Sequence, residues 1–488
     1  MRKIWLVFSV ALACSSEGGD TTAADTSAAV DVGGEADIAA PTEDVAVDTA
    51  EPVDVPAAPD VPTEAPDATE VPDMGMDPDV AAVEDVPDVP VCVPACEGKN
   101  CGQDGCGGVC GYCNADFPEC VEGVCQPYCP TCQQHGTVLA PEGTIPIRGA
   151  LVWATKTPPS SFPEGVFCDT CVDLPKGTPH AFSGVDGKFN LPITSEGEWT
   201  IVVQKGTFRR VRTLNIVAGQ QELGKEVTAL PSKTDLAAGD QIPSMIVVAD
   251  TYDEIENTLG KLGLGEVDEW GYLDEGTESF ELVDEYDAEE LFTDEAELAK
   301  YQIIFMPCAS GWFFPTLEAA DVQGRLREWV QKGGRLYVTD WSYDILKVLF
   351  PDPIKWLGDD GDLDSAQLGS SYDGKGQVLD DGLKLWLDGQ GLTQFDLLAN
   401  WTIIESVSKY TAPDVDGTLV EMEPTVWMNV VTPDDGSRPA TVSFQWGCGR
   451  GMFSTYHSED GEDFLPQEKS LAYILFEVAL CADTKYEQ

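Results

Sequence analysis

The stretch WVQKGGRLYVTD, residues 329–340, contains the end of one helix and the whole of one buried strand. Upstream of it, apolar residues recur on one side of a predicted helix over 317–332, which identifies the face that packs on a core. Gly333 and Gly334 predict the end of that helix. Arg335–Thr339 is β-rich and Asp340 follows it, so the segment predicts a buried strand that ends in a carboxylate. The predicted core positions of the helix are Leu317, Val322, Leu326, Trp329 and Val330.

The same alternation of strand and helix extends on both sides of this stretch. SMIVVAD at 244–250 and YQIIFMP at 301–307 are apolar runs of strand length, and helical spacing follows at 252–262 and around 345–346. Repeated strand–helix units place helices on both faces of a sheet. We therefore expect an α/β three-layer domain over 240–488 with a mostly parallel sheet.

Three of these pieces, in their order, resemble a known family. YQIIFMPC, WVQKGGRLYVTD and RGMFSTYHSED (450–460) are similar to the class I glutamine amidotransferase-like fold, which is flavodoxin-like, with a long insertion near 355–395. The resemblance implies a Cys on a tight strand-to-helix turn, a His that takes its proton and a Glu two residues later. His457 and Glu459 fit the last two roles.

The nucleophile is less clear from the sequence. The turn at 339–342 reads TDWS, so it has neither a Cys nor the Gly residues that would let such a turn strain. Three alternatives follow. The catalytic site is lost, or Ser342 replaces the nucleophile with His457 as base, or Cys308 acts as nucleophile in a rearranged site.

Other polar clusters give weaker signals. DDGDLD at 359–364 resembles a calcium loop but has Ser370 where an EF-hand carries its distal Glu. We interpret it, and DGED at 460–463, as solvated loops, with cation binding as the alternative. GCGRG at 447–451 is typical of a hairpin turn. We expect neither a metal site nor a cofactor.

Residues 133–235 predict an all-β sandwich, because short β-rich runs alternate with Asp-Gly, Glu-Gly and Lys-Gly turns. The order GTV, IRGALV, DGKFNL and WTIVV resembles carboxypeptidase regulatory-like domains, which implies a non-catalytic module. The basic cluster FRRVR at 208–212 predicts a solvated strand face, with Arg210 and Arg212 on one side and Arg209 on the other. Docking of these arginines on the chain's own acid is the alternative.

Ten of the chain's 16 Cys lie in residues 92–132, too densely for a hydrophobic core. The run GKNCGQDGCGGVCGYC resembles a Gly- and Cys-rich module of exported myxobacterial-type proteins. We expect disulfides, with zinc binding at the Cys-x2-Cys pairs as the alternative. Two disulfides between Cys129/Cys132 and Cys168/Cys171 are favoured. Cys308 has Cys448 and Cys481 as candidate partners, with one of the three left over. The full set of disulfide candidates is Cys92, Cys96, Cys101, Cys106, Cys110, Cys113, Cys120, Cys125, Cys129, Cys132, Cys168, Cys171, Cys448 and Cys481.

The amino terminus predicts export. Arg2 and Lys3 precede the apolar run 4–10, and small residues lead to Cys14, as in a bacterial lipobox. We expect a signal peptide at 1–13 and a lipid on Cys14, with an ordinary secretory signal as the alternative. Residues 14–91 predict a disordered stalk, because 15–91 hold 21 Asp/Glu, ten Pro and no Lys, Arg or aromatic residue. An acidic tail that binds cations or a partner is the alternative.

The net charge of −58 argues against nucleic acid as a partner. Together these features predict a protein exported to the outer membrane or cell surface and held there by its lipid. The leading hypothesis is a binding or scaffolding protein, with an unidentified envelope protein or glycan as partner and an unassigned oligomeric state. The alternatives are a hydrolase or glutaminase-like enzyme, which uses Ser342 or Cys308 with His457 and Glu459, and a structural spacer.

Overall fold

The computed structural model describes residues 93–478, apart from gaps at 107, 114–118, 122, 127–128, 130–131, 170, 251, 310, 312–313, 459–460 and 462–463. Several predictions therefore lie outside the described residues, namely those on the signal peptide, Cys14, the stalk, Cys92, Glu459, DGED at 460–463 apart from Gly461, and Cys481. Within the described part of the chain, no helix is both long and apolar enough to cross a bilayer.

Disulfides hold the cysteine-rich segment together, as predicted. Its strands have only two or three residues each: β1 (Gly102–Gln103), β2 (Val109–Gly111), β3 (Glu119–Val121) and β4 (Val124–Gln126). Three bonded pairs staple them, Cys96–Cys110, Cys101–Cys120 and Cys113–Cys125, and Cys106 is also disulfide-bonded. The sulfurs of Cys101, Cys113 and Cys125 lie close together, but they belong to these pairs and are not thiolates available to zinc.

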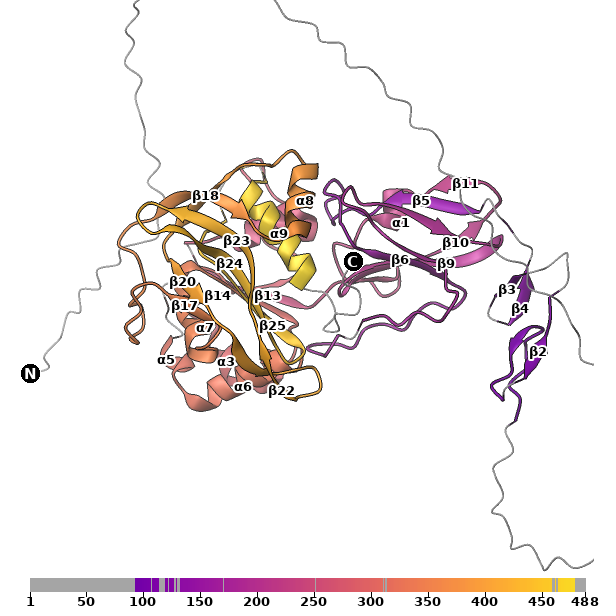
Figure 1. Cartoon of the computed structure of the whole chain (residues 1–488), viewed down its shortest axis with the longest axis horizontal. Coiled ribbons are helices and arrows are strands. Elements are labelled where there is room, and N and C mark those ends of the chain that lie inside the picture. Colours follow the sequence, from indigo (N-terminus) through magenta and orange to yellow (C-terminus); the bar gives the residue numbers. More distant parts are fainter. Residues whose placement is uncertain are drawn as a thin grey trace, which may run out of the picture. The chain divides into compact units, whose positions relative to one another are not determined.

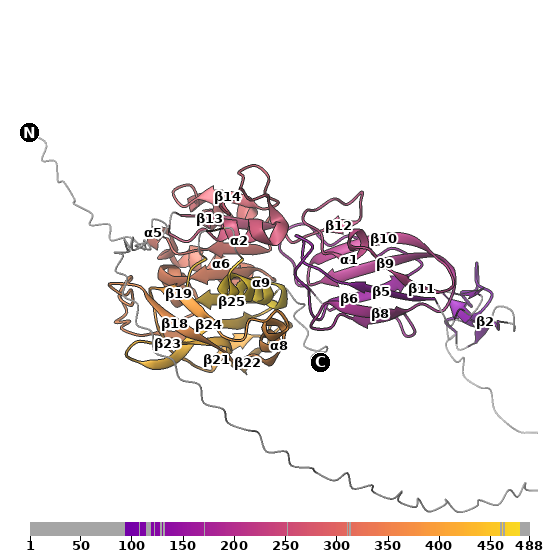
Figure 2. The same cartoon turned by 90° about the horizontal axis from the view of Figure 1, so that it is seen from above.

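Two sheets follow, and their facing sides share one apolar core. The larger has the order β12-β10-β9-β6-β7, and the smaller has the order β11-β5-β8 (Figure 2). Trp199, Ile201 and Leu191 are buried between them. The strands are β5 (Gln133–Thr137), β6 (Leu151–Thr155), β7 (His180–Phe182), β8 (Lys188–Pro192), β9 (Gly197–Lys205), β10 (Phe208–Ile216), β11 (Gln220–Glu222) and β12 (Asp240–Gln241), with the short helix α1 (Lys225–Thr228).

The basic cluster on β10 binds the chain's own acid. Arg210 and Arg212 lie 3.0 and 2.9 Å from Asp240 Oδ1 on the neighbouring strand β12. Buried Arg209 donates to the Ser160 carbonyl and to Gln241 Oε1. The expected solvated face is therefore wrong. In this strongly acidic molecule, Arg210 and Arg212 balance the charge of a neighbouring carboxylate. The attraction between these charges outweighs the solvation of the strand face.

A nine-stranded sheet forms the rest of the molecule, in the order β14-β13-β15-β16-β25-β24-β23-β18-β19 (Figure 1). The five strands from β14 to β25 are parallel, and the pairs from β25 to β19 are antiparallel. The strands are β13 (Met245–Ala249), β14 (Glu281–Asp284), β15 (Ile303–Met306), β16 (Arg335–Thr339), β18 (Tyr372–Val378), β19 (Asp396–Asn400), β23 (Thr425–Thr432), β24 (Gly436–Trp446) and β25 (Gly449–Ser454).

The expected mostly parallel sheet is therefore only half right. From residue 419 to 454 the chain runs through strands joined by tight turns, and antiparallel neighbours need only such turns, whereas parallel ones need a crossover. The predicted hairpin at 447–451 is the turn between β24 and β25. Two small antiparallel pairs complete the strands: β17 (Ile354–Trp356) with β20 (Ile404–Val407), and β21 (Tyr410–Pro413) with β22 (Leu419–Met422).

Helices cover both faces of this sheet, as predicted (Figure 1). Alternate residues of β15 point to opposite cores: Ile303 and Phe305 pack with the α8 and α9 side, Ile304 and Met306 with the α3 to α7 side. The helical elements are α2 (Ile255–Leu259), the π-helix η1 (Gly260–Leu264), α3 (Glu289–Thr293), α4 (Glu295–Leu298), α5 (Phe314–Leu317), α6 (Ala320–Gln331), the 3₁₀ turn η2 (Asp340–Ser342), α7 (Tyr343–Leu349), α8 (Asp381–Gly389) and α9 (Pro466–Val478). The helix predicted over 317–332 begins at Ala320, and four of its five predicted core positions are buried in α6, whereas buried Leu317 ends α5.

The disulfide pairing corrects the prediction for the second cysteine group. Cys129 pairs with Cys132, and Cys168 pairs with Cys448, 280 residues away in the turn between β24 and β25. Cys171 is also disulfide-bonded. The insertion between β6 and β7 is therefore tied to the nine-stranded sheet and not to β5. Spacing in the sequence could not reveal a partner that folding brings from so far along the chain.

Candidate functional site

Polar side chains meet where the parallel strands end, which is the usual position of sites in α/β sheets. Cys308 lies two residues after β15, Asp340 directly after β16 and His457 three residues after β25. Asp253 follows β13 at the same edge. Because β13, β15, β16 and β25 are adjacent and parallel, residues far apart in the sequence lie side by side here.

Asp340 occupies the strained turn that the family resemblance assigns to the nucleophile. Its φ is +43°, in the left-handed region, although it is not a glycine. The absence of Gly from this turn predicted no such strain, and the structure corrects that prediction. Asp tolerates this region better than most residues because its short side chain bonds locally. The Asp340 carboxylate accepts a hydrogen bond from the Trp401 backbone N–H at 2.8 Å.

His457 lies between Asp340 and Cys308. Its Nε2 is 3.2 Å from Asp340 Oδ2, and the Cys308 side chain lies close enough to act electrostatically on the imidazole. Burial alone would lower the pKa of His457, but the neighbouring Cys308 and Asp340 outweigh it and hold that pKa well above its ordinary value. Burial raises the pKa of Asp340 to about 6, although the hydrogen bond to His457 acts in the opposite direction.

A second carboxylate supports the same edge of the sheet. Asp253 accepts from the Thr339 hydroxyl and, through its other oxygen, from the backbone N–H and hydroxyl of Ser458. Thr339 Oγ1 in turn accepts from the Cys308 backbone N–H at 2.9 Å. Asp253 therefore fixes the residue before Asp340 and the residue after His457, and through Thr339 it also fixes the backbone of Cys308.

Ser342 is not placed as a nucleophile. Its hydroxyl donates to the Pro307 carbonyl at 2.6 Å, and the residue is fully buried. It ties the turn after β16 to the end of β15. Of the four predicted catalytic residues, the structure brings together His457 and Cys308, and it gives Ser342 a different role. Glu459 is outside the described residues.

Aromatic side chains close the site. Cys308 is buried with Trp401, and Tyr252 and Trp341 pack against them. Trp341 meets Trp401 edge to face at 5.3 Å and donates its indole N–H to the Trp401 carbonyl. Cys308 is 0% exposed and His457 4%. A thiolate stabilised by an imidazolium is a nucleophile in principle, but in this conformation neither water nor a substrate reaches it.

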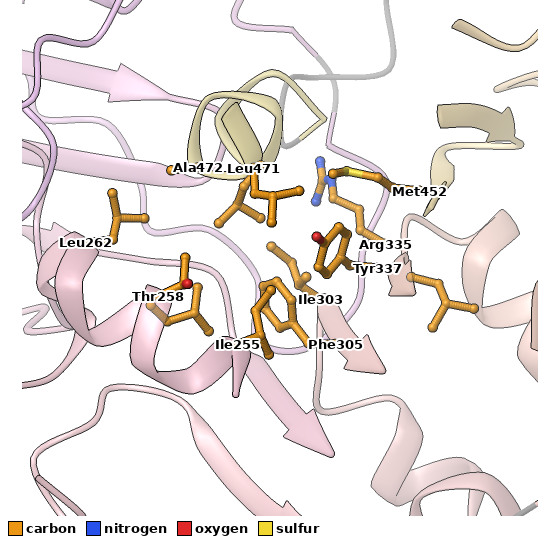
Figure 3. Close-up of a pocket in the computed structure, with 13 residues that line it drawn as sticks. Ile255, Thr258, Leu262, Ile303, Phe305, Arg335, Tyr337, Met452, Leu471 and Ala472 are labelled. Atoms are coloured by element: carbon orange, nitrogen blue, oxygen red, sulfur yellow. The ribbon is translucent and has the colours of Figure 1, made fainter. Parts of the chain in front are cut away.

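An apolar pocket lies elsewhere, between the sheet and helices α2 and α9 (Figure 3). Its internal space is about 30 Å³, and its walls are apolar apart from Thr258, Arg335 and Tyr337. None of Cys308, Asp340 or His457 lines it. The pocket is a packing defect of the core between sheet and helices and contributes nothing to the chemistry of these residues.

The carboxylates at 359–364 hold an internal ammonium group. Lys347 Nζ lies 2.7 Å from Asp359 and 3.2 Å from Asp344, and it donates to the Asp362 carbonyl. Of the carboxylates in this loop, that of Asp359 therefore pairs with a lysine of α7.

Asp340, Asp253 and Thr339 were not among the predicted site residues. The available signal was an Asp directly after a buried strand, in TDWS. The family resemblance implies a Cys or Ser as the functional residue of this turn, so it did not suggest a role for Asp340.

Comparisons with known proteins identify no family. No family model matches the chain. No curated protein matches it either. Solved structures with partial likeness include the GH42 β-galactosidase Gan42B from G. stearothermophilus (12% identity, TM-score 0.24, 49% of this chain and 30% of that one). The chain thus spans less than a third of that enzyme.

Two smaller proteins are covered almost completely. A cytoplasmic protein from Salmonella typhimurium LT2 has 12% identity and a TM-score of 0.30, over 49% of this chain and 99% of that one. A putative GMP synthase protein from Thermoplasma acidophilum has 10% identity and a TM-score of 0.28, over 49% of this chain and 94% of that one. Similarities at this level assign neither a family nor an activity to this chain.

Proposed function

We propose that this chain is an exported, lipid-anchored protein of the cell envelope that binds or scaffolds other envelope components, and that its amidotransferase-like centre is a structural network without catalytic activity. The observation that carries the second part is Asp340. A buried carboxylate occupies the nucleophile's turn, accepts a backbone hydrogen bond and pairs with the histidine that would otherwise act as base.

The exported location is supported by two independent features. The amino-terminal sequence ends its apolar run at Cys14, which is typical of a lipobox. The described residues also include five disulfides with both partners assigned, spread over the cysteine-rich segment, the sandwich and the nine-stranded sheet. Such bonds form in oxidising compartments and are rare in the cytosol.

A thiol hydrolase is the second candidate, and one contact favours it. The Cys308 side chain lies beside His457, and Asp340 stands where it can orient that histidine, the role first given to Glu459. Cys308 Sγ would attack the acyl carbon while His457 takes up the thiol proton, and His457 would pass that proton to the amine or alcohol that leaves. Water would then hydrolyse the thioester and restore the free thiol. For this chemistry, the Trp341 and Trp401 side chains must separate to admit a substrate.

A hydrolysis assay on the purified mature protein tests the proposal. Glutamine and a small activated ester are offered to the wild type and to Cys308→Ala, His457→Ala and Ser342→Ala. We expect no turnover above the buffer rate from any of them. Turnover by the wild type and by Ser342→Ala that is absent from Cys308→Ala and His457→Ala would establish the hydrolase instead. Mass analysis of the amino-terminal peptide, with a diacylglyceryl group on Cys14, tests the anchor separately.

A further inference from the structure

One loop presents a large aromatic side chain to solvent on a fixed support. We call residues 266–277 the Trp270 loop; it joins η1 to β14. Trp270 is 63% exposed and Tyr272 is 41% exposed. Burial of an exposed indole under a partner contributes favourably to the free energy of binding. Tryptophan is also over-represented among the residues that dominate binding energy.

The backbone of the loop is ordered before any partner arrives. Asp268 Oδ1 accepts from the backbone N–H groups of Trp270 and Tyr272 at 2.8 and 3.0 Å, and the Asp268 N–H donates to the Tyr272 carbonyl. Gly271 adopts a φ of +89°, which closes the turn directly after Trp270. A preformed turn loses little conformational entropy on binding.

Two glycines allow the loop to sit on the helix beneath it. A Cβ at Gly260 would lie 2.7 Å from Val267 Cγ1, and one at Gly265 would lie 2.5 Å from Leu273 Cδ1. The Leu273 N–H also donates to Asn257 Oδ1 at 2.8 Å. Leu273 at the base of the loop is therefore half-buried against the protein, while Trp270 at the turn is exposed.

The charge around Trp270 selects the partner. Residues 266–281 contain seven Asp/Glu and no Lys or Arg. The carboxylates nearest to Trp270 in the sequence, Asp268 and Glu269, are exposed. A second copy of this chain, with a net charge of −58, would be repelled. A guanidinium or ammonium group, by contrast, is attracted both by carboxylates and by the face of an indole.

We propose that the Trp270 loop docks an arginine- or lysine-rich segment of another protein, with one cationic side chain over the Trp270 ring and its neighbours paired with the loop carboxylates. The inference rests on the proposed binding function and gives it a class of partner. The loop leads into the amino end of β14, whereas Asp340 and His457 lie at the carboxyl ends of the parallel strands. The loop and the Asp340–His457 centre are thus associated with opposite ends of the parallel strands, and they can be tested separately.

The test uses fluorescein-labelled octa-arginine and the full mature chain, with binding followed by fluorescence anisotropy. Any acidic protein binds this peptide at low salt, so the measurement is made at 50 and 300 mM salt. Trp270→Ala leaves the charge unchanged and removes only the ring. Leu385→Ala is the matched control, because Leu385 is 53% exposed on α8 and is also uncharged.

At 300 mM salt we expect Trp270→Ala to weaken binding by about fivefold, and Leu385→Ala to leave it unchanged. Equal affinity of Trp270→Ala and wild type would overturn the proposal, since the peptide would then be held by net charge alone. Displacement of the peptide by a neutral oligosaccharide would also overturn it, because the ring would then be a glycan platform. Neither result bears on hydrolysis, so a negative binding result leaves the proposed function intact. Turnover at Cys308 would refute the proposed function and would say nothing about the Trp270 loop.

Discussion

At the scale of single residues, Asp340 determines what the centre can do. It combines a left-handed backbone, full burial and two partners, the Trp401 N–H and His457. The left-handed backbone and the burial of a carboxylate each cost free energy, and the two partners offset part of that cost. The carboxylate accepts from the buried Trp401 N–H and lies beside the buried His457 ring, and these contacts support the structural role that we propose.

Substitution of Asp340 should separate its contributions. Asp340→Ala leaves the Trp401 N–H and His457 without an acceptor and puts a less tolerant residue in the left-handed region, so we expect a loss of about 3 kcal/mol in the free energy of unfolding. Asp340→Asn keeps an acceptor and tolerates the backbone, so we expect about 1 kcal/mol. Urea unfolding at pH 7 measures both. Two variants as stable as the wild type would contradict the structural role.

The pKa of His457 predicts the pH dependence of its contribution. Because the folded pKa lies above the unfolded one, the stabilisation is fully present below the unfolded pKa of about 6.5 and is lost as the pH rises through the folded value. The difference in unfolding free energy between the wild type and His457→Gln should therefore be larger at pH 6 than at pH 9. A difference that grows with pH would show that the buried histidine is neutral.

Part of the centre could be predicted from residues alone and part could not. His457 and Cys308 are rare, chemically distinctive side chains near strand ends, so the sequence singled them out. Asp340 is one of 86 acidic residues, and nothing local marks it as buried. The pairing of Asp253 with Ser458 joins residues 205 apart, which only the strand order brings together.

At the scale of elements, close packing of α6 on β25 depends on a glycine. A Cβ at Gly449 would lie 2.0 Å from the Val330 carbonyl and 2.1 Å from the Gly334 carbonyl, both of them backbone atoms that cannot move aside cheaply. We expect Gly449→Ala to cost about 3 kcal/mol by forcing the helix away from the strand.

Gly324 provides the matched control for this prediction. It lies in the exposed middle of α6, and a Cβ added there would have nothing within 4 Å. Gly324→Ala should stabilise the protein by about 0.5–1 kcal/mol, because Ala is the better helix former. Urea unfolding compares the two variants, and a Gly449→Ala protein as stable as Gly324→Ala would show that α6 and β25 do not need this close approach.

The order of elements was largely predictable where helix and strand alternate, because the two periodicities differ. The α6 core positions and the buried strands β13, β15 and β16 follow from that contrast. The antiparallel half of the sheet was not predicted, since β-rich runs such as β23 and β24 carry no local sign of their partners' direction. Strand pairing is a property of the folded chain and not of one segment.

At the scale of the whole molecule, one disulfide joins parts that are distant in sequence. Cys168 and Cys448 enclose 280 residues, so their bond restricts the unfolded chain far more than the bond between Cys129 and Cys132, which are three residues apart. Lys205 of β9 and Glu477 of α9, 2.8 Å apart, add a contact between the same parts.

Removal of the long-range disulfide should therefore lower stability strongly. We expect the double variant Cys168→Ala/Cys448→Ala to lose about 4 kcal/mol of unfolding free energy. The double variant Cys129→Ala/Cys132→Ala controls for the loss of sulfur atoms with a short loop and should lose less. Equal losses in urea unfolding would show that the long connection contributes no constraint of its own.

The central claim, a closed and structural centre, is tested most directly by alkylation of Cys308 in the folded protein. The mature chain is treated with iodoacetamide at pH 8, without and with denaturant, and the peptide that carries Cys308 is quantified by mass spectrometry. With Cys308 0% exposed beneath Trp341 and Trp401, we predict negligible modification of the folded protein and complete modification after unfolding. Rapid modification of the folded wild type, slowed in His457→Ala, would contradict the claim and identify a reactive thiol.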